Sequence, residues 1–155
     1  MAMRPVSARR VLAGASVADA EALWNDLRRW PGFVDGFGRV ARVEGDWPCR
    51  RTRLVWDSRP GGRGRVVEQV ESYEPGSSLR LRVEDEQLRG TQAVVFEALP
   101  GGCAMTLELA YALKRPGFGG VLTDVFFVRH ALRESLRRTL ERFAIELRSD
   151  RELAS

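Results

Sequence analysis

The sequence predicts an α+β domain in which a curved antiparallel sheet of about six to seven strands wraps on a long C-terminal helix. Two observations predict it. From residue 118 to about residue 148, apolar side chains recur at three- and four-residue steps, the period of a helix packed on one face. From residue 40 to residue 113 they mostly alternate one by one, as in strands with two different faces. Such a helix spans roughly 45 Å, so we expect a large sheet and an enclosed cavity beneath it.

The N-terminal part predicts one strand and two short helices. Residues 6–13 alternate as a strand. Ser16 and Asp19 have the spacing of a capping box, so a helix is expected to begin there and to end near Arg29. Pro31 is expected to force Trp30 out of helical geometry and so to separate this helix from a second short helix or turn at residues 33–37.

The middle of the chain predicts six further strands. They are expected at residues 40–44, 51–58, 65–73, 79–84, 92–99 and 103–113. The connecting segments are mostly short and rich in glycine and proline, which favours an antiparallel meander. Gly61 to Gly64 form a hairpin turn in this prediction, not a phosphate loop, because a strand and not a helix follows them. The charged run at residues 84–86 is expected to be solvated and not to bind metal.

The inward face of the strand at residues 65–73 is left open by the sequence, because Val66 and Val70 compete with Val67 and Tyr73 for the interior.

In the C-terminal helix, an apolar stripe contains one charged residue, Arg129. The apolar members of the stripe are Leu122, Val125, Phe126, Leu132, Leu136, Leu140, Phe143 and Leu147.

Length and composition indicate one domain over residues 1–155, with a core at about 6–148 and a frayed tail at 149–155. Hydrophobic residues make up 44% of the chain, enough for a sizeable core. No run of eighteen apolar residues predicts a membrane span, and the N-terminus does not resemble a signal peptide. We therefore expect a cytoplasmic protein.

The charge pattern does not predict nucleic-acid binding. The formal net charge is +4 and the pI about 9.8, which alone would suit a nucleic-acid or anionic-lipid surface. However, the arginines are interspersed with Asp and Glu and form no basic block.

Cys49 and Cys103 are far apart, neither belongs to a CxxC motif, and His130 is the only histidine. Neither a metal site nor a cofactor is expected.

Three segments carry a resemblance to a known superfamily. They are residues 24–33 (WNDLRRWPGF), 64–68 (GRVVE) and 125–129 (VFFVR). Together with the order of elements, they make the chain similar to the START-like or SRPBCC superfamily, whose fold is called helix-grip or Bet v 1-like. The polyketide cyclase/dehydratase-like and coenzyme-Q-binding-like branches resemble it most. The resemblance implies a cavity between sheet and long helix that takes lipids, sterols, quinones, plant hormones or polyketides, with residues 116–120 as a hinge at its entrance.

Candidate ligand-binding residues are apolar or aromatic side chains on the expected inner faces, with a few polar ones among them. The aromatic members could equally form the ordinary core. The candidates are Phe33, Phe37, Leu54, Trp56, Val67, Gln69, Tyr73, Leu81, Val83, Phe96, Leu107, Leu109, Phe126 and Arg129.

Evidence for catalysis is weaker. In aromatase/cyclase relatives, a tyrosine soon after the Trp-Pro and an arginine late in the strand after the glycine loop serve the chemistry. This sequence has Phe37 and Tyr73 at those positions. The remaining candidates for catalysis are Tyr73, Arg129 and His130. Arg129 has a second interpretation, an internal ion pair with Glu71.

Three functional hypotheses follow. The favoured one is a binder of a hydrophobic small molecule such as a lipid, a quinone or a polyketide-like compound, without a cofactor. The alternative is a polyketide cyclase/dehydratase-type enzyme that uses the same cavity. The second alternative is a basic-surface protein or ribosome interaction module. A homodimer is compatible with each of them.

Overall fold

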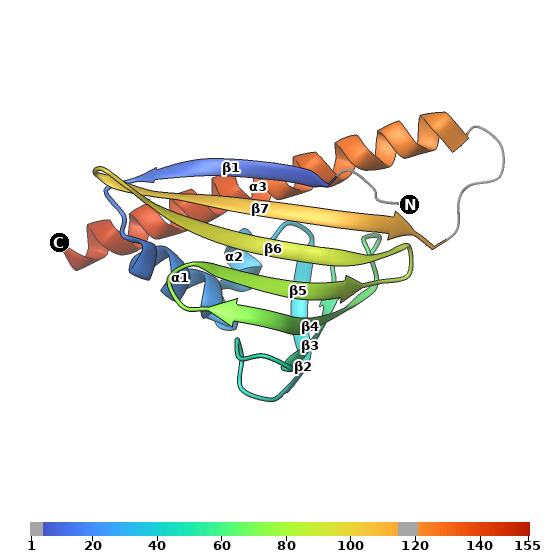
Figure 1. The fold of residues 1–155 in the computed structure, drawn as a ribbon, viewed down its shortest axis with the longest axis horizontal. Coiled ribbons are helices and arrows are strands. Elements are labelled where there is room, and N and C mark those ends of the chain that lie inside the picture. Colours follow the sequence, from blue (N-terminus) through green and yellow to red (C-terminus); the bar gives the residue numbers. More distant parts are fainter. Residues whose placement is uncertain (1–4, 115–120) are drawn as a thin grey trace.

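A computed structural model describes residues 5–114 and 121–155 of the chain, with the backbone alone for residues 121–125. It confirms the predicted architecture: one curved antiparallel sheet, two short helices after the first strand and a long C-terminal helix (Figure 1). The elements are β1 (Val6–Ala13), α1 (Val17–Asn25), the 3-10 turn η1 (Leu27–Arg29), α2 (Trp30–Phe33), β2 (Phe37–Glu44), β3 (Arg53–Ser58), β4 (Arg65–Glu74), β5 (Ser78–Glu84), β6 (Leu88–Leu99), β7 (Gly102–Leu113) and α3 (Val121–Ala154).

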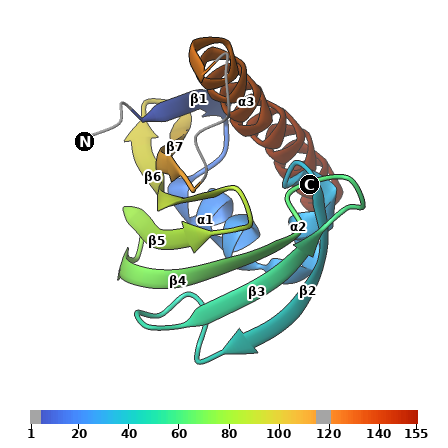
Figure 2. The same cartoon turned by 90° about the vertical axis from the view of Figure 1, so that its right-hand side faces the viewer.

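The sheet has the order β1-β7-β6-β5-β4-β3-β2, and its neighbouring strands are antiparallel. The strands from β2 to β7 form a meander, and β1 pairs with the last strand, β7. The two edges of the sheet are therefore β1 and β2. The glycine loop between β3 and β4 is the expected hairpin turn, in which the amide of Ser58 donates to Gly64 O at 2.9 Å. Figure 2 shows that the sheet curves around α1 and α2. One concave face therefore receives all the helices.

The break between α1 and α2 differs from the sequence prediction. Ser16 does cap α1 through a capping box with Asp19, as expected. The first break falls at Asp26, whose φ of −84° and ψ of 93° are extended. Trp30 is helical, with φ −53° and ψ −37°, and Pro31 lies inside the first turn of α2. The prediction that Pro31 excludes Trp30 from a helix is wrong, because a proline near a helix N-terminus gives up an amide that has no helical partner there.

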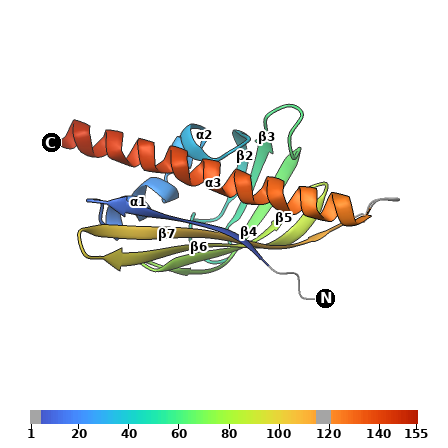
Figure 3. The same cartoon turned by 90° about the horizontal axis from the view of Figure 1, so that it is seen from above.

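Helix α3 crosses the concave face at an angle (Figure 3) and extends further than predicted. It continues to Ala154, so the expected frayed tail at residues 149–155 is mostly helical. Asp150 accepts hydrogen bonds from Arg29, and Arg151 donates to Ala13 O at 3.0 Å. These contacts tie the last turns of α3 to η1 and β1. The expected hinge at residues 116–120 and the predicted helix start at residue 118 lie outside the described residues.

Polar contacts fix α2 against the middle of α3. Asp35, just after α2, accepts from Ser135 Oγ at 2.8 Å and from Arg138 Nη2 at 3.1 Å. Its amide donates to Thr139 Oγ1 at 3.0 Å. Burial disfavours the charge of Asp35, but the hydrogen bonds from Arg138 and Ser135 outweigh it and lower the pKa of this carboxyl. Asp35 and three residues of about one turn of α3 thus hold the two helices in one relative position.

Strand β4 has an inner face that the sequence left open. Cross-strand partners decide it: Glu68 is opposite Val83 and Val70 is opposite Leu81, and both partners are buried. An irregularity in register lies between Val70 and Ser72, after which Tyr73 is opposite Leu79. The inner face therefore carries Val66, Glu68, Val70 and Tyr73.

No helix among the described residues is long and apolar enough to cross a membrane.

Candidate functional site

The concave face of the sheet is largely apolar, apart from Glu68 on β4 and Gln92 on β6, which is opposite Leu81 and Leu109. Period-two alternation places every second side chain of each strand there, and these side chains are buried. The apolar members from β3 to β7 are Leu54, Trp56, Val66, Val70, Leu79, Leu81, Val83, Leu88, Val94, Phe96, Cys103, Met105, Leu107, Leu109 and Tyr111. On the other side, α3 contributes Leu136, Leu140, Phe143 and Leu147. This interior is the candidate functional site.

Aromatic rings fill the end of the interior next to α1 and α2. The ring centroids of Phe33 and Phe143 are 5.0 Å apart, and those of Phe37 and Trp56 are also 5.0 Å apart. Trp24 packs on Trp30 at 5.4 Å. Centroid distances in this range are those of contacting aromatic pairs. Phe33 and Phe37, predicted to line a ligand site, are therefore packed against protein rings here.

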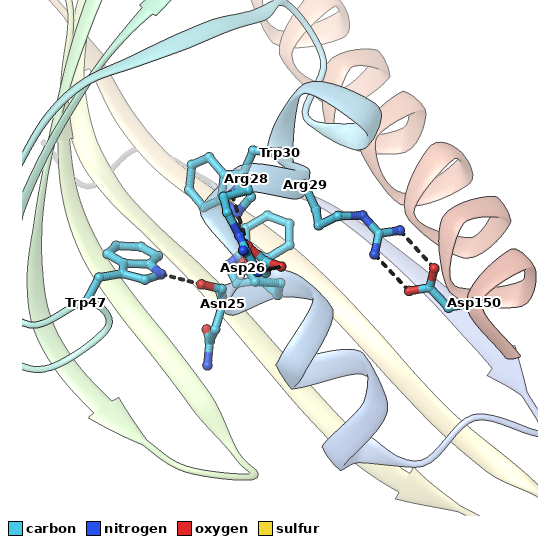
Figure 4. Close-up of polar contacts among 8 residues, drawn as sticks. Asn25, Asp26, Arg28, Arg29, Trp30, Trp47 and Asp150 are labelled. Atoms are coloured by element: carbon cyan, nitrogen blue, oxygen red, sulfur yellow. Dashed lines mark hydrogen bonds and ion pairs between the residues drawn. The ribbon is translucent and has the colours of Figure 1, made fainter. Parts of the chain in front are cut away.

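Hydrogen bonds position the α1–α2 segment that carries these rings (Figure 4). Trp30 Nε1 donates to Trp24 O at 2.7 Å, and Trp47 Nε1 donates to Asn25 O at 3.1 Å. Arg29 bridges to α3 with a bidentate contact to Asp150, at 3.0 and 3.1 Å. The segment 24–33, one of the three that carried the family resemblance, closes one end of the interior.

The structure places most of the predicted apolar lining residues on the concave face and three predicted residues elsewhere. Those that point inward are Leu54, Trp56, Leu81, Val83, Phe96, Leu107 and Leu109. Val67 and Gln69 point to the convex face, because Glu68 between them occupies the inner position opposite Val83. Phe126 is 70% exposed. The half-buried side chains Val128 and Leu132, instead of Phe126, continue the inner stripe of α3 toward its N-terminus.

The three predicted catalytic candidates do not come together. Tyr73 is half-buried at the end of β4, where its hydroxyl accepts from Asn25 Nδ2 at 3.3 Å. Burial, with Glu21 nearby, raises the pKa of Tyr73 above its ordinary value, which makes it a poorer proton donor at neutral pH. His130 is exposed on α3.

Arg129 lies near the N-terminal end of α3, where its Nη2 donates to Pro5 O at 3.1 Å. The suggested internal pair with Glu71 is not formed as predicted. Glu71 contacts Arg82 at 3.3 Å on the convex face. The physical reason is the irregularity of β4, in which Glu71 is the extra residue between Val70, opposite Leu81, and Ser72, opposite Arg80 on the outer face.

A buried polar cluster under the β3–β4 hairpin was missed by the sequence analysis. It consists of Trp56, Arg63, Glu68 and Asp85. Arg63 Nε donates to Asp85 Oδ2 at 2.6 Å, and the side chain of Asp85 is only 1% exposed. Asp85 also accepts from the amides of Gln87 and Leu88. The expectation that residues 84–86 are all solvated is therefore wrong for Asp85, which has the partners that a buried carboxylate requires.

Glu68 is the most perturbed titratable group of this cluster. It is 3% exposed, and burial raises its pKa to about 7. The positive charge of Arg63 and the indole N–H of Trp56 favour the ionised form, but they only partly offset the loss of solvation. The sequence did contain a signal for this position, because Glu68 alternates with Val66 and Val70. A charged residue among them, however, favours assigning this face of the strand to the solvent side and the opposite face to the interior.

The described side chains contain no group of three His, Cys, Asp or Glu residues placed to hold a metal ion. Many of their arginines pair with acidic side chains, such as Arg65 with Asp57 and Arg138 with Asp35. The site chemistry available within the interior is therefore apolar contact, together with the hydrogen-bonding groups of the polar cluster.

Comparison with known families gives one match that covers nearly the whole chain. The family model described as polyketide cyclase/dehydrase and lipid transport matches residues 3–148. No curated protein matches the sequence.

Several solved structures share the fold. TTHA0849 from Thermus thermophilus is 23% identical with a TM-score of 0.76, over 95% of this chain and 99% of that one. The di-domain ARO/CYC StfQ from the steffimycin biosynthetic pathway is 19% identical, with a TM-score of 0.71 over 96% of this chain and 52% of that one. Norcoclaurine synthase from Thalictrum flavum, in complex with dopamine and hydroxybenzaldehyde, is 12% identical with a TM-score of 0.69, over 94% of this chain and 87% of that one. At these identities the likeness concerns the fold alone.

Proposed function

Because the chain belongs to the polyketide cyclase/dehydrase and lipid transport family, we propose that it binds a hydrophobic small molecule between the concave face of the sheet and α3. The ligand classes that we favour are lipids, quinones and polyketide-like compounds. No cofactor takes part in this proposal.

The observation that supports it most is that α3, among the described residues, packs chiefly on one edge of the sheet, β1, and on α2, and not chiefly on the central strands. The central strands β4, β5 and β6 nevertheless present a concave face that is apolar except at Glu68 and Gln92. Ligand sites in proteins are mainly apolar with a few placed polar groups, and this face, with the polar cluster at Glu68, has that composition.

Native mass spectrometry of the purified protein, followed by organic extraction, tests the proposal directly. We expect a retained apolar molecule, or failing that, saturable binding of the neutral probe N-phenyl-1-naphthylamine with a rise in melting temperature. A protein that is isolated empty, does not bind the probe and does not shift its melting temperature with fatty acids, quinones or aromatic polyketides would contradict the proposal.

A matched pair of variants locates the bound molecule. Val94 points inward on β6 and is buried, whereas its neighbour Val95 points outward and is exposed. Val94→Phe should weaken binding of the probe by reducing the interior space, and Val95→Phe should leave binding unchanged. The melting temperature of each variant shows whether a loss of binding reflects unfolding. Equal binding by the two variants would place the probe outside the interior.

A second candidate function is a cyclase- or dehydratase-type enzyme, and Glu68 is the observation that favours it. Such chemistry needs a group that removes and returns protons next to a carbonyl, and a carboxyl with a pKa near neutrality suits that task. The test is the dehydration of a β-hydroxyketone to its enone, followed by ultraviolet absorbance. Turnover that Glu68→Gln abolishes would support this candidate, and absence of turnover in a protein that binds the β-hydroxyketone would exclude it for that substrate class.

A further inference from the structure

Three buried polar atoms of the Glu68 cluster have no hydrogen-bond partner among the described residues. They are Glu68 Oε2, Trp56 Nε1 and Arg63 Nη2. Buried polar groups are almost always paired, since an unpaired one costs on the order of 1–3 kcal/mol. The indole N–H of Trp56 is near enough to lower the pKa of Glu68, but none of the three atoms has a hydrogen bond of full geometry within the described part of the chain, so the cluster keeps hydrogen-bonding capacity for a further group.

The three atoms belong to side chains that neighbour one another on the inner surface. Leu54 is opposite Glu68 and Trp56 is opposite Val66, so Trp56 and Glu68 are diagonal neighbours on β3 and β4. The guanidinium carbon of Arg63 lies 5.7 Å from the ring centroid of Trp56. Trp56 and Arg63 both act on the charge of the Glu68 carboxylate, although neither makes a hydrogen bond of full geometry to its Oε2.

Contacts with the β5–β6 turn fix the orientation of the cluster. Arg63 is held through its Nε by Asp85, and Asp85 is itself held by two backbone amides of the β5–β6 turn. This contact fixes the plane of the guanidinium, and Nη2, on the same edge as Nε, makes no hydrogen bond of its own with the described residues. Such a supporting contact preorganises a donor for a partner that comes from the interior.

The chemistry of these atoms selects one kind of polar group. When Glu68 is ionised, as it is above its pKa of about 7, the cluster offers one carboxylate oxygen that accepts and two N–H groups that donate. A carbonyl or ether oxygen would satisfy the donors but leave Glu68 unpaired. An amine would be repelled by Arg63, and a carboxylate would be repelled by Glu68. A hydroxyl donates to the carboxylate and accepts from an N–H, so it satisfies both kinds of atom at once.

We propose that Glu68, with Trp56 and Arg63, forms the polar subsite that binds a hydroxyl group of an otherwise apolar ligand. This inference rests on the proposed function, because the apolar body of the ligand would lie against the concave face. The ligand class is accordingly an alcohol or phenol, such as a long-chain alcohol or a phenolic polycycle. A water molecule would satisfy the same three atoms, and an absence of preference in the test below corresponds to that case.

Two probes that differ only at the oxygen test the subsite. They are 2-naphthol, which carries the hydroxyl, and 2-methoxynaphthalene, which does not. Binding of each is measured by displacement of N-phenyl-1-naphthylamine at one pH. We expect the wild-type protein to prefer 2-naphthol by about tenfold or more, the value of a hydrogen bond to a charged group. In Glu68→Leu the preference should fall to near unity, while Glu68→Gln, which keeps an accepting oxygen, should retain part of it.

Glu97→Leu provides the control, since Glu97 is an exposed glutamate on the outer face of β6 and its replacement should not change the preference. Equal binding of both probes to the wild type, or an unchanged preference in a folded Glu68→Leu variant, would overturn the subsite and leave the proposed function intact. If the wild type bound neither naphthalene nor N-phenyl-1-naphthylamine, the subsite and the proposed function would fall together.

Discussion

Arg29 and Asp150, which are separated by most of the chain, form a bidentate ion pair that joins η1 to the last turns of α3. Arg29 also donates to Glu146 at 2.6 Å, and these two acids raise the pKa of its guanidinium. The side chain of Arg29 is 34% exposed, so solvent screens part of the interaction.

We expect Arg29→Met, which keeps the aliphatic stem, to lower the free energy of unfolding by about 1 kcal/mol, because a network of two acids loses its cation. The neighbouring Arg28 makes a local pair with Asp26 and its side chain is 89% exposed, so Arg28→Met is the matched control and should change stability little. Urea denaturation measures both, and the difference between them should shrink in high salt. Equal effects of the two substitutions would show that the pair to α3 contributes nothing.

Glu68 should make stability depend on pH in an unusual direction. Its pKa is about 7 in the folded protein and 4.5 ordinarily, so the folded state holds the proton more tightly. The contribution of Glu68 is therefore fully present below about pH 4.5 and is lost as the pH rises to about 7, by an amount on the order of 3 kcal/mol.

Glu68→Gln removes this titration. We expect the variant to gain stability relative to the wild type between pH 5 and pH 8, as measured by urea denaturation at both values. The carboxyls with lowered pKa, such as Asp35, contribute in the opposite sense, since their stabilisation is lost only as the pH falls below the ordinary carboxyl range. Parallel stabilities of wild type and variant at the two pH values would contradict a raised pKa for Glu68.

Much of the fold could be predicted from the sequence because its signals are local. Ser16 and Asp19 are three residues apart, and their capping box alone fixes the start of α1. Residues 79–83 alternate without interruption, and Leu79, Leu81 and Val83 are indeed the buried ones. Periodicity works here because the apolar side chains of a strand or helix must share one face.

The features that could not be predicted depend on partners distant in the chain. The inner face of β4 is determined by register with β3 and β5, and an irregularity after Val70 interrupts the alternation that periodicity relies on. The last turns of α3 resemble a polar tail until Arg29 and Ala13 O supply partners for Asp150 and Arg151. Asp85 likewise resembles a solvated turn residue, because the sequence does not reveal that Arg63 approaches it.

Asp85 should be far more important for stability than the acidic residues beside it. Asp85→Ala would leave Arg63 without its anchor and two turn amides without an acceptor, in a buried environment. We expect a loss of about 3 kcal/mol in the free energy of unfolding. Glu86→Ala, at the exposed neighbour, should be nearly neutral. Thermal and urea denaturation of the two variants would decide it, and similar stability of both would show that Asp85 is effectively solvated.

Gly90 should tolerate no side chain, although it lies in the interior of a long strand. It is opposite Tyr111, and a Cβ built on it would fall well inside contact distance of Ala110 O, a backbone atom that cannot turn away. Gly90→Ala should therefore force β6 and β7 apart and cost about 2 kcal/mol. Gly62→Ala in the exposed β3–β4 loop is the control, because the nearest atom to its added Cβ is 3.1 Å away and a small shift of the loop relieves the contact. Since the two strands form one side of the proposed ligand site, Gly90→Ala should also weaken binding of N-phenyl-1-naphthylamine, measured well below its melting temperature. A Gly90→Ala protein as stable as Gly62→Ala would mean that the backbones of β6 and β7 are further apart than they are here.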